Sequence, residues 1–275
     1  MPTTDDLKQR LSDAAQQARG EFVMALLVSE VIDAEVDSEN LRQLFADLLT
    51  PIAGLEAMEV EQLLDFFRDC GFATQGPQPA DLSHSNLQWV IAQRQGLPIA
   101  VAALLIEAAR RYGIVAHGIN YPGHFLVSLD QQLVDPLSLR AVQLQQLEAK
   151  LTAQQQQDVM TPTLTSVFGL RMLNNVKIQY ARAQNWVEVL DILECQLVVE
   201  TVDPVAQAAL QFERGECLLQ MQQPVDAQRA YVSCLEMSPP PALAQQVEAP
   251  APSARVSGTR QPSGRAQSSC SCSCS

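Results

Sequence analysis

This sequence has no long apolar run. The longest, residues 99–106, is far shorter than the ~20 apolar residues that a membrane-spanning helix needs. The N-terminus opens on Thr3, Thr4, Asp5 and Asp6, without the cationic start and apolar stretch of a secretory signal. We therefore expect a cytoplasmic protein with no membrane span and no signal peptide.

Basic residues are scarce. The chain has 18 lysines and arginines against 31 acidic residues, which gives a net charge of −13. Such a surface repels phosphate backbones and anionic lipids, and the sequence contains no basic patch that would offset it. We expect no binding to nucleic acid or to membranes. Proteins and small molecules remain as partners.

Histidines are few, and the cysteines do not suggest a disulfide framework. His84, His117 and His124 match the spacing of no known metal site, so neither a metal nor a cofactor is expected. His84 is predicted to face solvent and His117 to lie on a strand. Cys70 is kept open as a displaced nucleophile, although its place before Gly71 at a helix end favours a packed apolar residue. The other cysteines stand singly in helical patterns or in a terminal Ser-Cys repeat: Cys195, Cys217, Cys234, Cys270, Cys272 and Cys274.

The first 70 residues carry a helical period of apolar residues and predict four acidic helices. Asp37 or Ser38 is placed to cap the third helix, and Pro51 to stop it. Gly71 is placed as the C-terminal stop of the fourth helix. We interpret residues 1–70 as the N-terminal helices of the first domain.

Residues 71–158 are predicted to form the core of that domain. A helix over 98–112 starts with a proline and is apolar nearly all round, so we expect it to be the most buried helix of the protein. A small antiparallel sheet should pack on it, which makes the fold class α+β. The predicted strands and the linker helix that follows them cover residues 114–119, 123–129, 132–135 and 136–158.

The helical period returns over residues 165–239. Gly215, Ala227, Tyr231 and Pro239 stand there at spacings of 12, 4 and 8. These resemble the small, aromatic and proline positions of a tetratricopeptide repeat. The preceding unit is degenerate, so the repeats are expected to lean on the first domain because they cannot bury their faces alone.

The repeat surface is the expected binding surface for a protein or peptide partner. We assign it to Tyr180, Trp186 and Gln211. Residues 240–275 are rich in Pro, Ala, Ser and Gln without an apolar period, and are predicted to be disordered.

His124 and Asp135 are candidates for a functional pair. If Asp130 and Gln131 form a two-residue turn, the two side chains share a face of the sheet, ~7–8 Å apart at the backbone. A three-residue loop would place them on opposite faces. With the two-residue turn, the pair is either a catalytic or ligand-binding dyad or a retained hydrogen bond that ties two strands. We favour the second, because no Ser or Cys occurs over residues 96–112.

Several motifs together resemble one bacterial family. They are Cys70-Gly71-Phe72, Ser85-Asn86-Leu87, Gly96-Leu97-Pro98-Ile99, Pro122-Gly123-His124-Phe125-Leu126-Val127 and Val134-Asp135-Pro136. Over about residues 55–240 the chain is similar to the SirB-one type, in which a transglutaminase-like domain precedes tetratricopeptide repeats. The resemblance implies a helix-rich, papain-like α+β core. It places the catalytic His and Asp at His124 and Asp135, and the nucleophile near residues 98–100, where this chain has Ala100 in place of a frequent serine.

Two functions remain. The first is a non-catalytic interaction or regulatory protein, in which a transglutaminase-like domain without its nucleophile is joined to repeats that hold a partner. The second is a hydrolase or acyltransferase whose His–Asp dyad activates water or uses Cys70. The missing nucleophile favours the first.

Overall fold

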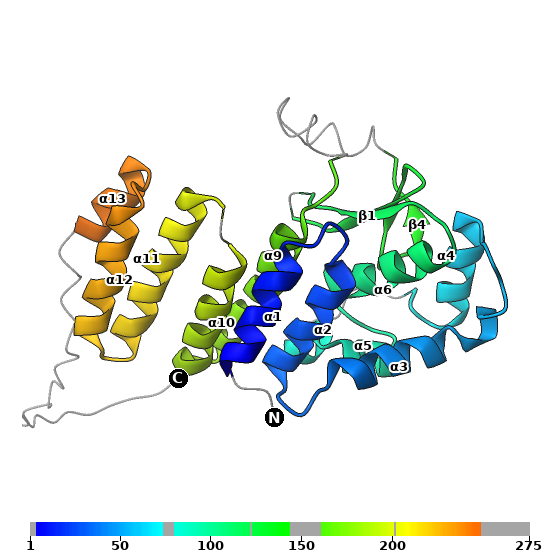
Figure 1. Ribbon diagram of the computed structural model, residues 1–275, viewed down its shortest axis with the longest axis horizontal. Helices are drawn as coiled ribbons and strands as arrows, with labels where there is room; N and C mark the ends of the chain where they lie inside the picture. Colours follow the sequence, from blue (N-terminus) through cyan, green and yellow to red (C-terminus); the bar gives the residue numbers. More distant parts are fainter. Residues whose placement is uncertain (1–3, 74–79, 122, 144–160, 201, 249–275) are drawn as a thin grey trace, which may run out of the picture.

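Figure 1 shows the computed structural model of the protein, which describes residues 4–73, 80–121, 123–143, 161–200 and 202–248. The described part of the chain is rich in helices and holds a four-stranded antiparallel sheet in the order β1-β2-β3-β4. The strands are β1 (Ala116–Ile119), β2 (Leu126–Leu129), β3 (Gln132–Asp135) and β4 (Arg140–Ala141). The α+β prediction is confirmed at this level.

The first 70 residues form four α-helices, as predicted. They are α1 (Thr4–Ala15), α2 (Glu21–Ile32), α3 (Ser38–Leu48) and α4 (Val60–Asp69), with a short 3-10 helix η1 (Thr50–Ile52) before α4. Asp37 caps α3 by accepting a hydrogen bond from the Glu39 N–H at 3.2 Å. Gly71, at a φ of 90°, closes α4 and lets the Phe72 N–H donate to the Phe67 carbonyl at 3.0 Å.

The central helix is α6 (Pro98–Arg111), which follows η2 (Leu82–Ser85) and α5 (Leu87–Gln93). Ten of its fourteen residues are buried. Nine of the twelve residues of α2 are also buried, so α6 is the most buried helix by number but not by share. The reason is that α2 contacts α9, which follows the sheet, as well as α6, α1, α3 and α5. In the described residues, no single helix is long and apolar enough to cross a membrane, and α5 with α6 passes that test only as a pair bent by 81°.

The sheet packs on α6 through β1 and β2, and its inner-face residues Val127, Leu129 and Val134 join the main core. Val127 pairs with Val134 and Leu129 with Gln132, so Asp130 and Gln131 form the two-residue turn, both with positive φ. This confirms the predicted hairpin.

Two predicted boundaries around the hairpin are wrong. The strand expected over 123–129 begins only at Leu126. The segment expected to form a linker helix over 136–158 begins instead with a turn and β4, which pairs with β3. Residues 144–158 lie outside the described part of the chain. The turn forms because the Asp135 side chain binds the backbone that follows it.

The remaining helices form pairs. α9 (Thr165–Arg182) pairs with α10 (Trp186–Val199), and α11 (Pro204–Gln220) with α12 (Pro224–Glu236), followed by α13 (Pro241–Glu248). Phe168, Met172 and Val176 of α9 are buried in the main core, where α9 contacts α2. The expected packing of this region on the first domain is therefore confirmed. In Figure 1, α11 to α13 lie on the side away from the sheet, with α1, α9 and α10 between.

The prediction of disorder over residues 240–275 is wrong at its start, because residues 241–248 form α13. Pro241 stands at the first position, where a helix needs no N–H from it. Leu243, Ala244 and Val247 are partly buried at helical spacing, on a helix that contacts α12. Residues from 249 onward lie outside the described part.

Candidate functional site

The start of α6 is the position expected for a nucleophile. Pro98 is its first residue, and Ile99 and Ala100 are 2% and 0% exposed. Gly96 precedes them in close contact with α5, since a Cβ there would come within 2.9 Å of the Val90 methyl groups. Asn86 caps α5 by accepting a hydrogen bond from the Gln88 N–H at 2.9 Å. These motif residues shape a tight turn between two helices and present no hydroxyl or thiol at the start of α6.

His84 is buried, so the prediction that it faces solvent is wrong. Its Nδ1 accepts a hydrogen bond from the Asp81 N–H at 3.0 Å, and its ring packs edge-on against Trp89. The 3-10 turn of η2 folds the imidazole back over its own start, which spacing alone does not reveal. Among the described residues, no cluster of three or more His, Cys, Asp and Glu side chains is arranged to hold a metal ion.

His124 lies on an exposed loop before β2. Its N–H donates to the Tyr121 carbonyl at 3.0 Å, and the two rings have centroids 6.2 Å apart. Gly123 allows the turn with a φ of 77°, and Pro122 lies outside the described residues. Because β2 begins at Leu126, His124 is not held in the ladder that would have placed it beside Asp135.

Asp135 ends β3 and binds its own turn. Its Oδ2 accepts hydrogen bonds from the Ser138 N–H at 3.1 Å and the Ser138 hydroxyl at 2.6 Å, and its Oδ1 accepts one from the Leu137 N–H at 3.3 Å. In the described part of the chain, no hydrogen bond or ion pair joins Asp135 to His124. The expected interstrand bond is not formed, because the local turn takes the carboxylate.

Cys70 lies at the C-terminal end of α4, partly buried against the main core. Burial raises the pKa of its thiol, and the nearby Arg94 cation only opposes that effect. A thiol with a raised pKa is a poor nucleophile at neutral pH. Cys70 therefore has the environment of a packed apolar residue.

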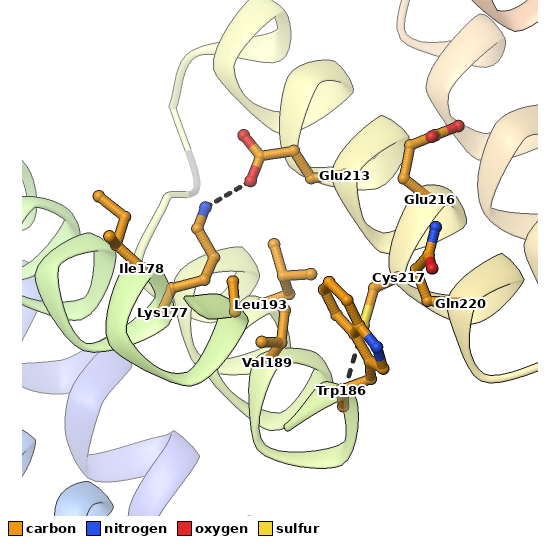
Figure 2. Close-up of a pocket in the computed structure, with 10 residues that line it drawn as sticks. Lys177, Ile178, Trp186, Val189, Leu193, Glu213, Glu216, Cys217 and Gln220 are labelled. Carbon is orange, nitrogen blue, oxygen red and sulfur yellow. Dashed lines mark hydrogen bonds and ion pairs between the residues drawn. The ribbon is translucent and has the colours of Figure 1, made fainter. Parts of the chain in front are cut away.

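A groove of about 270 Å³ lies between α9, α10 and α11 (Figure 2). Lys177 of α9 forms an ion pair with Glu213 of α11 across it. The Cys217 thiol donates to the Trp186 carbonyl at 3.2 Å, and burial raises the pKa of that thiol. The rest of the lining is mostly apolar: Ile178, Ala181, Val189, Leu193, Glu216 and Gln220.

Of the three residues assigned to the repeat surface, only Trp186 lines this groove. Tyr180 is partly buried between the main core and the helical pairs, and Gln211 places a buried Oε1 elsewhere on α11. Sequence reasoning missed Ile178 and Lys177. The sequence feature that could have revealed them is the short connection between α9 and α10, which brings the last turns of α9 beside the start of α10.

Comparison with known families gives a match for the larger, N-terminal part of the chain. Residues 5–174 match the family model of the transglutaminase-like superfamily, which is more than half of the chain. The chain belongs to the transglutaminase-like superfamily. The match runs from α1 through the sheet and ends inside α9, so α9 belongs both to this transglutaminase-like domain and to the helical pairs.

Relatives of this transglutaminase-like chain are UPF0162 proteins. Those of Xylella fastidiosa strains Temecula1 and 9a5c are 29% and 30% identical over 134 residues, covering 44% of this chain and 48% of theirs. The UPF0162 protein of Pseudomonas aeruginosa is 33% identical over 104 residues, covering 37% of this chain and 38% of its own. The chain thus spans about half or less of the length of the curated relatives it matches. No solved structure matches it.

Proposed function

We propose that this chain is a non-catalytic interaction or regulatory protein of the SirB-one type. In this proposal, its transglutaminase-like domain has lost covalent chemistry, and tetratricopeptide-type helices bind a partner peptide. The observation that carries the proposal is the open apolar groove beside Trp186. Ala100, buried at the expected nucleophile position, and the separation of His124 from Asp135 support the non-catalytic part.

The contact between α11 and α12 supports the tetratricopeptide interpretation of residues 165–239. A Cβ on Gly215 would come within 2.4 Å of the Tyr231 ring, so the helices pack through a small residue against an aromatic one. Ala227, the second small position of the spacing, is fully buried. These are the positions that such a repeat uses to join its two helices.

The groove favours a peptide that combines an apolar anchor with a basic neighbour. Its lining carries two carboxylates, Glu213 and Glu216, against the single cation Lys177, which is already paired with Glu213. The Tyr231 hydroxyl donates to Glu216 at 2.5 Å and holds that carboxylate in place. A cationic flank would be attracted to this rim, while burial of an apolar side chain beside Trp186 would supply most of the affinity.

The test is selection of peptides from a random display library on the intact chain, followed by titration of one recovered peptide. Ile178→Ser and Trp186→Ala should each weaken binding about tenfold or more, because hot-spot anchors lose on the order of 2 kcal/mol when truncated. Val187→Ala is the matched control, since Val187 is 59% exposed and adjacent to Trp186 but does not line the groove. Urea unfolding of each variant separates lost binding from lost folding.

Two outcomes would overturn the proposal. Peptides that bind all three variants like the native chain would show that the groove is not the binding site. Turnover of an amide or ester by the purified chain, abolished in His124→Ala, would show that the domain is catalytic and would support the hydrolase or acyltransferase alternative.

A further inference from the structure

A polar cavity of about 360 Å³ lies at the opposite end of α6 from Pro98. Three segments meet there: residues 18–21 between α1 and α2, residues 110–117 from the end of α6 into β1, and residues 162–163 before α9. At 1.5 Å per helical residue, Arg110 is ~18 Å along the axis from Pro98. The cavity contains none of the residues of the transglutaminase-like motifs.

One wall of the cavity is a buried ion pair. Glu21 is 1% exposed, and its carboxylate accepts hydrogen bonds from both terminal nitrogens of Arg110, at 2.7 and 3.0 Å. The Arg110 Nε donates to the Ala116 carbonyl at 3.0 Å, which fixes the guanidinium between α2 and β1. Since the two charges neutralise each other, this wall adds no net charge to the cavity.

Two groups at the cavity have no protein partner within the described residues. Thr163 places a buried Oγ1 there without a hydrogen-bond partner, although its backbone N–H donates to the Gly118 carbonyl at 2.8 Å. Buried hydroxyls nearly always form a hydrogen bond, so a buried hydroxyl without a protein partner at a cavity wall is available to a ligand atom. Arg19 lines the same cavity with an exposed guanidinium that forms no ion pair with the described side chains.

His117 of β1 completes the set. It is partly buried, and burial lowers the pKa of its imidazole, an effect that the Glu21 charge opposes and the Arg110 charge reinforces. A lowered pKa favours the neutral ring, which offers one N–H donor and one acceptor nitrogen. It adds hydrogen-bonding capacity to the cavity without a second unpaired cation.

We propose that this cavity binds a small organic carboxylate, with Arg19 facing the carboxylate and Thr163 and His117 binding the polar remainder of the molecule. One uncompensated cation matches one carboxylate, whereas a phosphate dianion would lie near Glu21 with half of its charge unmatched. The volume falls within the ~300–1,000 Å³ typical of small-molecule sites. Arg19 thus leaves the cavity with one net positive charge in a chain whose net charge is −13.

The experiment follows the imidazole NMR signals of His117, assigned with His117→Gln, during titration with carboxylates, their amides and inorganic phosphate. The probes are 4-hydroxybenzoate with 4-hydroxybenzamide and lactate with lactamide, since each acid carries one carboxylate and a hydroxyl group. At least one carboxylate should shift the His117 signals and raise the pKa of His117, while its amide and phosphate do not at equal concentration. Arg19→Ala should weaken that binding about tenfold, and Thr163→Val about threefold.

Arg182→Ala is the control for charge, because Arg182 is also an exposed arginine, at the end of α9, and does not line the cavity. Thr163→Val removes a hydroxyl that has no partner, so it should leave the melting temperature unchanged or higher. The proposal is overturned if no carboxylate shifts His117 at millimolar concentration, if amides or phosphate bind as well, or if Arg182→Ala weakens binding as Arg19→Ala does. None of these readouts depends on the peptide groove.

Discussion

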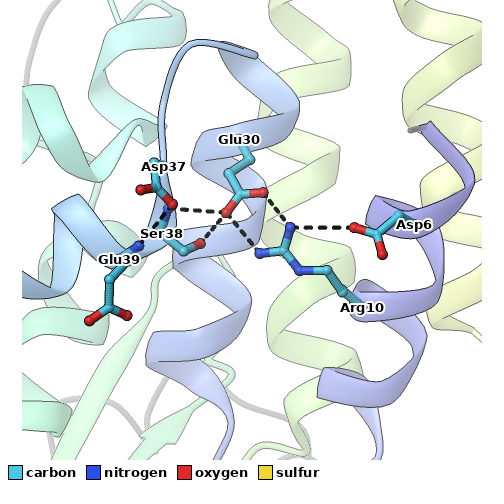
Figure 3. A network of polar contacts seen from close by, with 6 residues as sticks. All are labelled: Asp6, Arg10, Glu30, Asp37, Ser38 and Glu39. Atoms are coloured by element: carbon cyan, nitrogen blue, oxygen red, sulfur yellow. Dashed lines mark hydrogen bonds and ion pairs between the residues drawn. The ribbon is translucent and has the colours of Figure 1, made fainter. Parts of the chain in front are cut away.

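The carboxylate of Glu30 on α2 holds both terminal nitrogens of Arg10 on α1, at 2.8 and 2.9 Å (Figure 3). The same carboxylate accepts hydrogen bonds from the Ser38 hydroxyl and from the Ser38 N–H, the latter at 3.1 Å, at the start of α3. Only 7% of Glu30 is exposed. One side chain therefore joins α1, α2 and α3.

This network predicts a pH dependence of stability. Burial acts to raise the pKa of Glu30, but the hydrogen bonds from Arg10 and Ser38 outweigh it, so its pKa lies below the ordinary value of 4.5. A carboxyl whose pKa is lowered on folding stabilises the folded state at pH values above its pKa in the unfolded state. This stabilisation is lost as the pH falls through its pKa in the folded state. Urea unfolding from pH 7 to pH 3 should show native chain and Glu30→Gln converging below about pH 4.5. A constant difference down to pH 3 would contradict this.

Breaking the Glu21–Arg110 pair on one side should be strongly destabilising. Arg110→Met leaves the Glu21 carboxylate buried and unpaired, and we expect the free energy of unfolding to fall by about 3–5 kcal/mol. Replacing both partners, as in Glu21→Leu with Arg110→Met, should lose less than the single change, because no buried charge remains. Denaturant unfolding of the two single variants and the double variant measures this. Additive losses would show that the two side chains act independently.

The features that the sequence predicted best are local. The Asp37 cap, the Gly71 stop and the Asp130-Gln131 turn each depend on a few neighbouring residues whose chemistry favours one geometry. The burial of α6 was also predictable, because its apolar residues cover nearly every side of the helix.

The features that were missed depend on long-range packing or on competition between partners. In the sequence, Glu21 resembles an ordinary acidic residue at the start of a helix. Its burial is explained only by its contact with Arg110, which is 89 residues away. His84 turns inward because η2 brings its ring against Trp89. Asp135 binds the donors of the turn that follows it, whereas His124 lies on the loop before β2.

The separation of His124 from Asp135 predicts that the two residues act independently. Asp135→Ala should lower the free energy of unfolding by about 1–2 kcal/mol, through the lost hydrogen bonds to the turn. His124→Ala should change it by no more than about 0.5 kcal/mol, because the ring is exposed. The double variant should equal the sum within about 0.5 kcal/mol. A larger coupling in the unfolding cycle would show that the side chains meet in solution.

Thiol reactivity should follow burial. Burial raises the pKa of Cys195 to about 11 and also raises that of Cys234, so both thiols are almost wholly protonated at pH 8. Iodoacetamide should label them in the native protein far more slowly than after unfolding in guanidinium, and mass spectrometry of the digested protein measures each rate. Rapid native labelling of Cys70 that disappears in His124→Ala would instead identify a relocated nucleophile.

The contact of Gly215 with Tyr231 predicts a change of sign between two backgrounds. In the native chain, Gly215→Ala places a Cβ within 2.4 Å of the Tyr231 ring, and the overpacking should cost about 1–3 kcal/mol. Alanine is otherwise the better helix former, by roughly 0.5–1 kcal/mol over glycine. In a Tyr231→Ala background the clash is absent, so the same Gly215→Ala change should stabilise α11. Urea unfolding of all four chains gives both differences. If Gly215→Ala stabilises the chain that keeps Tyr231, then α11 and α12 do not pack through this pair, and the small-to-aromatic contact behind the tetratricopeptide interpretation is lost.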